Sequence, residues 1–214
     1  MSDLPPKPKR RPSWSKSLIN ILLVCGGCVA TLLPAWLPNR PAVPLESGTV
    51  ELLQAFLLAA SAAIVWGASS HAGAYRPVCR VLGLGFLAAF VGEIEDFASN
   101  ILDLKFPEAG VVAVILGVIL IDCLRHRRIV FHFFATIGNH AGAGFIAAAL
   151  LILYVFNRII GSPKFWLATL GEENFSALIP RTCRGYLELL ACYLIFVGAL
   201  GLSLTLARRS EPHS

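Results

Sequence analysis

Six apolar stretches separated by short polar segments run along the chain. A membrane span needs roughly 20 apolar residues, because the hydrocarbon core is about 30 Å thick and a helix rises about 1.5 Å per residue. The pattern therefore predicts an all-α fold, a polytopic transmembrane helical bundle of about six spans. The predicted spans are Ser17–Leu37, Thr49–Ala68, Pro77–Ser99, Pro107–Leu124, Ile129–Phe156 and Gly185–Ala207.

Two of these spans differ from the usual length. The uninterrupted apolar core of the fourth, Gly110–Ile121, has only 12 residues, so a re-entrant segment is the alternative to a full crossing. The fifth span is long, and we expect it to be tilted, or broken near Gly138–Gly144. In the loop that follows it, Ser162-Pro163 is a good helix start and Gly171 a plausible stop, which predicts a short interfacial helix.

Composition supports a membrane protein with one domain. Hydrophobic residues make up 56% of the 214, the mean hydropathy is +0.70, and only 14% are charged, whereas soluble domains carry about 25%. Because no polar stretch is long enough to fold alone, we expect a single transmembrane domain over 17–207. A disordered basic tail, 1–16, precedes it, and a short tail, 208–214, follows it.

The positive charges predict an orientation. The net charge is +5, and five of the 18 basic residues lie in positions 1–16, where they indicate topology or contact with anionic lipid rather than nucleic acid. With the N-terminus in the cytoplasm, 12 lysines and arginines lie on the cytoplasmic side and 6 on the other. The prediction is a multi-pass protein of a bacterial inner membrane with both termini cytoplasmic. Its first span is expected to be uncleaved, and its partners are the lipid bilayer and, as a hypothesis, another membrane protein.

Three carboxylates end the third predicted span, within the sequence VGEIEDFASN. Glu93, Glu95 and Asp96 fall in one helical turn, and Glu93 lies about 24 Å along the span, in the outer third of the membrane. Acids repel one another and are disfavoured at a helix C-terminus, so the cluster predicts a cationic partner, a bound metal or a retained proton. The alternative is a helix end solvated among the headgroups.

Other polar residues are expected at the same depth. Glu51 and Gln54 open the second span, Glu188 opens the sixth, and three arginines in or beside the outer loop are candidate partners for the acids. His140 falls near the middle of the fifth span as a candidate proton relay or metal ligand, with hydrogen-bonded packing as the alternative. The candidate polar site comprises Glu51, Gln54, Glu93, Glu95, Asp96, His140, Arg158, Arg181, Arg184 and Glu188.

The remaining motifs indicate packing. The chain has no diagnostic nucleophile motif, phosphate-binding loop or zinc-ligand spacing, so we predict no metal and no cofactor. Cys25-Gly-Gly-Cys28 has redox spacing, but an apolar surrounding suppresses the thiolate that redox chemistry requires. Small residues such as Gly83, Gly142 and Gly198 mark points where helices can approach closely.

Two segments, GEIEDF at 92–97 and YLELLACYL at 186–194, resemble parts of small bacterial multi-pass inner-membrane proteins with no assigned activity. The resemblance implies a membrane location and names no reaction. Three functional hypotheses follow from the residues. The first is a polar outer-leaflet site that handles a cation, protons or a lipid headgroup. The second is a membrane-embedded enzyme acting on a lipid or polyprenyl substrate. The third is a non-catalytic subunit of a membrane complex.

Overall fold

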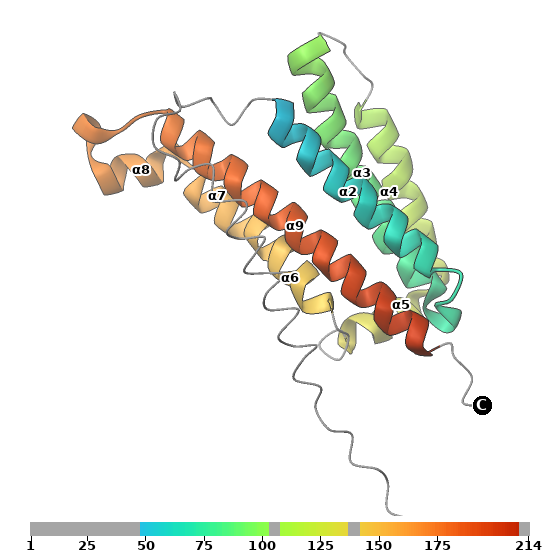
Figure 1. Ribbon diagram of the computed structural model, residues 1–214. Helices are drawn as coiled ribbons and strands as arrows, with labels where there is room; N and C mark the ends of the chain where they lie inside the picture. The colour runs from blue at the N-terminus through green and yellow to red at the C-terminus, as the bar shows by residue number, and fades with distance from the viewer. Residues whose placement is uncertain (1–47, 103–107, 137–141, 210–214) are drawn as a thin grey trace, which may run out of the picture.

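The computed structural model describes residues 48–102, 108–136 and 142–209, and within these ranges the chain is helical with no strand (Figure 1). The all-α prediction is therefore confirmed for this part of the chain. The helices are α2 (Gly48–Ala68), α3 (Arg76–Leu102), α4 (Glu108–Arg125), α5 (Arg127–Ala135), α6 (Ala143–Leu151), α7 (Asn157–Ile160), α8 (Pro163–Leu170) and α9 (Leu178–Arg209). Short 3₁₀ turns, η1 (Gly73–Tyr75) and η4 (Glu172–Asn174), precede α3 and follow α8, and a π-helical turn, η3 (Ile152–Phe156), joins α6 to α7.

Four helical stretches in the described ranges are long and apolar enough to cross a membrane. They are Val50–Ala68, Gly73–Glu95, Ala143–Ile160 and Leu178–Leu206. The pair α4 and α5 qualifies as a fifth only when taken together, with a bend of 90° between its halves. The first predicted span, Ser17–Leu37, lies outside the described residues.

Most predicted boundaries match the observed helices closely. The second, third and fourth predicted spans correspond to α2, α3 and α4, and the predicted short helix after Ser162 is confirmed as α8. α9 begins seven residues before the predicted Gly185. Charged residues set the predicted start, but Pro180 in the first turn suits a helix N-terminus, and the Leu178 N–H bonds the Ser176 hydroxyl.

The fifth predicted span is not one helix. α5 ends at Ala135, α6 begins at Ala143, and the axis of α5 is bent by 90° from that of α4. Gly142, immediately before α6, has φ of +90°, a conformation that glycine adopts without strain. The expected break near Gly138–Gly144 is therefore the form observed, and residues 137–141 lie outside the described ranges.

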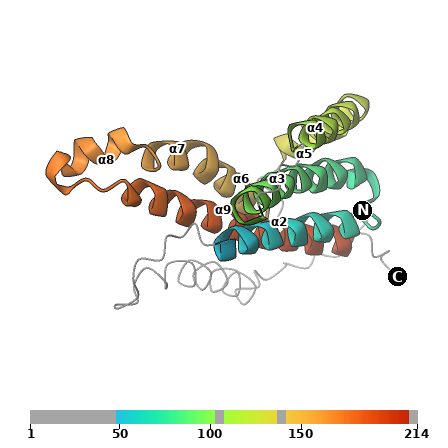
Figure 2. The same ribbon diagram turned by 90° about the horizontal axis from the view of Figure 1, so that it is seen from above.

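α2 and α9 pack together and connect two groups of helices. α2 packs against both α3 and α9, α3 packs against α4, and α6, η3 and α7 pack against the other side of α9 (Figure 2). Buried side chains such as Leu189, Ile195 and Leu202 follow α9 along most of its length. Outward-facing side chains of α4 and η3 are apolar and exposed, among them Val114 and Tyr154. Such surfaces suit contact with lipid chains.

Glycines allow two close helix contacts. A Cβ built on Gly142 would lie 2.2 Å from the Gly198 carbonyl oxygen, so the start of α6 lies backbone to backbone against α9. A Cβ on Gly83 of α3 would lie 3.4 Å from the Trp66 ring on α2. A Cβ on Gly144, two residues after Gly142, would meet open space. The small residues therefore act in packing at particular positions and not as a general stripe.

We expect Gly142→Ala to destabilise the protein by at least about 2 kcal/mol, because the new methyl group collides with the backbone of α9 and the backbone angle becomes strained. Gly144→Ala is the matched control and should be neutral or stabilise slightly, since alanine is the better helix former. The free energy of unfolding is measured by titrating SDS into detergent micelles and following far-ultraviolet circular dichroism. Equal stability of the two variants would contradict the Gly142–Gly198 contact.

Candidate functional site

The centre of the site is Gln54, a buried amide where three helices meet. Its side chain is 3% exposed on α2 and lies between Glu93 of α3 and the first part of α9. With Nε2 toward α3, the amide donates to Glu93 Oε2 at 3.1 Å and Oε1 accepts from the Leu189 N–H at 3.2 Å. The reverse orientation offers only a 3.4 Å contact from Nε2 to the Gly185 carbonyl. We assign the first orientation because it satisfies both ends of the amide.

A second polar group surrounds Glu188 on α9. Asn157 Nδ2 donates to Glu188 Oε1 at 2.8 Å, and Arg184 Nε donates to the same oxygen at 2.9 Å. The Glu188 side chain is 24% exposed and that of Arg184 is 63% exposed, so the ion pair has one half-buried and one open partner. The Asn157 Oδ1 atom is buried and has no hydrogen-bond donor among the described residues.

The π-helical turn η3 places Asn157 in this group. The turn covers Ile152–Phe156, and α7 starts at Asn157 directly after it. A π turn holds more residues than an α turn, so it changes which side of the helix the following residues face. Such turns are frequent at functional sites.

The two polar groups are neighbours. Gln54, which bonds Glu93, also accepts from the N–H of Leu189, the residue that follows Glu188. Three helices besides α9 therefore contribute to one region: α2 through Gln54, α3 through Glu93, and α7 through Asn157. Its donor set consists of carboxylate and amide oxygens, which hard cations and protons bind.

The acidic segment does not lie at the C-terminus of α3, where we had expected it. α3 continues to Leu102, so Glu93 lies nine residues from its C-terminus and Asp96 six. Because the dipole effect falls off within the last turn, it does not disfavour these acids. Glu95 lies about 200° around α3 from Glu93, since each residue turns the helix by about 100°. It therefore points away from the side of α3 that meets Gln54.

The other candidate residues have different positions. Glu51 is half-buried in the first turn of α2, while Arg158 on α7 and Arg181 on α9 are exposed. The side chain of Asp96 and the whole of His140 lie outside the described residues. Arg184 forms an ion pair with Glu188, which is a candidate acid but does not belong to the VGEIEDFASN cluster.

Asn157 was not among the candidate residues. It follows the apolar run ALLILYVF near the end of its span, and this polar break was the available signal. Asp122, near the end of α4, forms another polar contact between helices. Its main partner is Arg80 on α3, with Nη2 to Oδ1 at 3.2 Å, while His126 Nδ1 lies 3.9 Å away. This pair links α3 to α4 at the opposite end of the molecule from Gln54 (Figure 1).

The described residues contain few other groups that could react or bind a metal. Cys79, Cys123, Cys183 and Cys192 are free thiols, and no three metal-ligating side chains converge within the described ranges. Cys25 and Cys28 lie outside these ranges.

Comparison with protein-family models, curated proteins and solved structures gives no match to this chain.

We expect the Gln54–Glu93 hydrogen bond to contribute about 1 kcal/mol of coupling energy, the usual order for polar contacts between membrane helices. The test is a double-mutant cycle of Gln54→Leu and Glu93→Gln, with unfolding free energies from SDS titration in micelles. A cycle of Gln54→Leu with Glu95→Gln is the control and should show no coupling. Equal coupling in the two cycles would remove Glu93 from the Gln54 network.

Proposed function

We propose that the protein is a six-span integral protein of a bacterial inner membrane, a helical bundle with both termini in the cytoplasm. The four described spans and α4 alternate in direction (Figure 1). We take α4 as the fifth span and the apolar segment Ser17–Leu37 as the sixth. Basic residues gather at one end, where α3 begins and α4 ends, which supports the cytoplasmic assignment of that end. They are Arg76, Arg80, Arg125, Arg127 and Arg128.

We further propose that the polar network in the opposite half of the membrane binds a proton or a small cation. The observation that carries this proposal is the buried Asn157 Oδ1 atom, an oxygen with no donor in the described structure, on a side chain that also bonds Glu188. A buried acceptor is stable only when it meets a donor or a cation. A protonated carboxyl, a bound cation or an ordered water would each meet that requirement, and the first two are chemistry that intramembrane carboxylates support.

The two carboxylates have different roles in this proposal. Glu188 is the ligand, because its oxygen already meets the Asn157 amide and the Arg184 guanidinium. Movement of Arg184, which is mostly exposed, would open the carboxylate to a competing cation. Glu93, positioned by Gln54, supplies a second negative charge close to the same part of α9.

We expect Glu188→Gln to weaken proton or cation binding about 10- to 100-fold, since a lost charged hydrogen-bond partner is worth about 1.5–3 kcal/mol. Binding is followed by infrared spectroscopy of carboxyl groups in liposomes during titrations with acid, Na⁺ and K⁺. Glu93→Gln should have a smaller effect in the same direction. Glu95→Gln, on the far side of α3, is the control. Identical titrations of wild type and Glu188→Gln would refute the site.

The other two hypotheses give different results in the same variants. An enzyme acting on a lipid or polyprenyl substrate would lose turnover in Glu93→Gln or Glu188→Gln while binding its substrate. The Ser61 hydroxyl, one candidate nucleophile, donates at 2.6 Å to the Leu57 carbonyl of its own helix. A non-catalytic subunit would lose recovery of its partner on purification, with no change in the infrared titration.

A further inference from the structure

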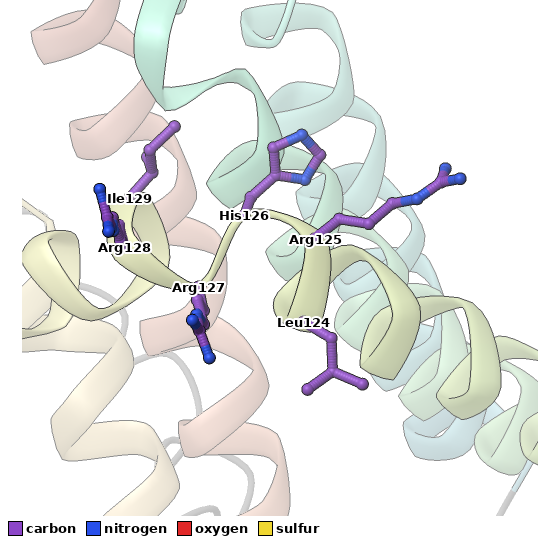
Figure 3. A pocket seen from close by; sticks show the side chains of 6 residues that line it. All are labelled: Leu124, Arg125, His126, Arg127, Arg128 and Ile129. Atoms are coloured by element: carbon purple, nitrogen blue, oxygen red, sulfur yellow. The ribbon is translucent and has the colours of Figure 1, made fainter.

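α5 lies across the end of the molecule that carries the basic residues. α4 ends at Arg125 and α5 begins at Arg127. The His126 N–H between them bonds the Asp122 carbonyl, and the His126 carbonyl accepts from the Val130 N–H. The two helix axes meet at 90° (Figure 3). If α4 stands along the membrane normal, α5 must therefore run parallel to the membrane surface.

The rest of the fold fixes α5 in this direction. Phe133 is 1% exposed and its ring meets that of Tyr75 edge to face, with centroids 6.0 Å apart. Val130 is also buried, and α5 packs against α3, α4 and η1. The bend is thus held by core contacts.

The outer sides of α5 carry aromatic and basic residues. Phe131 is 75% exposed and Phe134 is 47% exposed, although both are large and apolar. Arg127 and Arg128 are exposed on the same helix. A short helix with buried anchors, exposed aromatics and exposed arginines has the composition of an interfacial helix that lies at the level of the lipid headgroups.

The bend itself forms a basic hollow of about 430 Å³. Its lining residues are Leu124, Arg125, His126, Arg127, Arg128 and Ile129. The side chains fan out around the bend instead of converging on one point, with Leu124 and Arg127 on the same side (Figure 3). Asp122, the nearby acid, is held by Arg80. Basic side chains that point in different directions can each meet a separate phosphate group of a lipid layer, but they cannot all surround one enclosed ligand.

We propose that α5 and this basic hollow bind the phosphate groups of anionic phospholipids, with Arg127 and Arg128 on the headgroups and Phe131 and Phe134 among the upper acyl chains. Guanidinium groups suit phosphate oxygens, and each basic residue near an anionic surface contributes about 1 kcal/mol. The inference rests on the membrane embedding proposed above, but it is independent of the carboxylate site.

The test is hydrogen exchange of the α5 amides in the full chain, reconstituted in nanodiscs of phosphatidylcholine with or without phosphatidylglycerol. We expect phosphatidylglycerol to slow exchange by about 30-fold in the wild type and to have little effect in the double variant Arg127→Gln/Arg128→Gln. The double variant Arg158→Gln/Lys164→Gln, at the opposite end of the molecule, is the matched control and should behave as the wild type. High salt should reduce the slowing, because it screens charge.

Two results would overturn the proposal: no slowing in the wild type, or equal slowing in the Arg127→Gln/Arg128→Gln variant. A third arm adds inorganic phosphate to phosphatidylcholine discs, and full slowing there would assign the site to free phosphate and reject the lipid. Unchanged exchange in α9 verifies that the variant is folded. Glu93→Gln should leave α5 exchange unaltered, so failure here and failure of the carboxylate site are distinguishable.

Discussion

The side-chain amide of Gln54 needs hydrogen-bond partners from the protein, because the surrounding helices leave it almost no contact with solvent or lipid. The partners that satisfy both ends lie on two other helices, the Glu93 carboxylate on α3 and the Leu189 N–H on α9. The hydrogen bonds therefore set the level at which α2, α3 and α9 meet, and apolar side chains on α9 fill the space below them. Apolar packing alone allows helices to slide past one another, whereas a buried amide with two fixed hydrogen-bond partners does not.

Charged side chains differ in burial and in their partners between the two ends of the molecule. Near Gln54 the carboxylates are half-buried and are held by amides and one arginine, so binding or loss of a single charge changes the local balance. At the other end the arginines are mostly exposed, and the one ion pair between spans there, Arg80 with Asp122, joins neighbouring helices among the described residues. The first arrangement suits the small ligand that we propose, and the second suits the broad lipid contact that we propose.

Helix bounds that depend on local apolarity could be predicted from the sequence. Features that depend on contacts between distant residues could not. The bounds of α2, α4 and α8 followed from apolar runs and from proline and glycine signals. The break in the fifth span near Gly138–Gly144 was expected. The contact of Gly142 with Gly198, 56 positions later, and the packing of α5 against Tyr75 from an earlier turn were not. At the site, the depth of Glu188 and Gln54 could be estimated from helix rise, but the choice between Glu93 and Glu95 required the rotation of α3.

The π-helical turn limits the insertions and deletions that this part of the chain can accept. Beyond Ile152–Phe156 the direction of every side chain depends on the extra width of that turn. Deleting one residue there would let the helix revert to regular α geometry and rotate the remainder by about 100°. Asn157 would then face a new neighbour, although its identity and the apolar character of the span would be unchanged. Spacing along this helix is therefore under as much constraint as residue type, and insertions or deletions in it should be tolerated far less well than substitutions of one apolar residue by another.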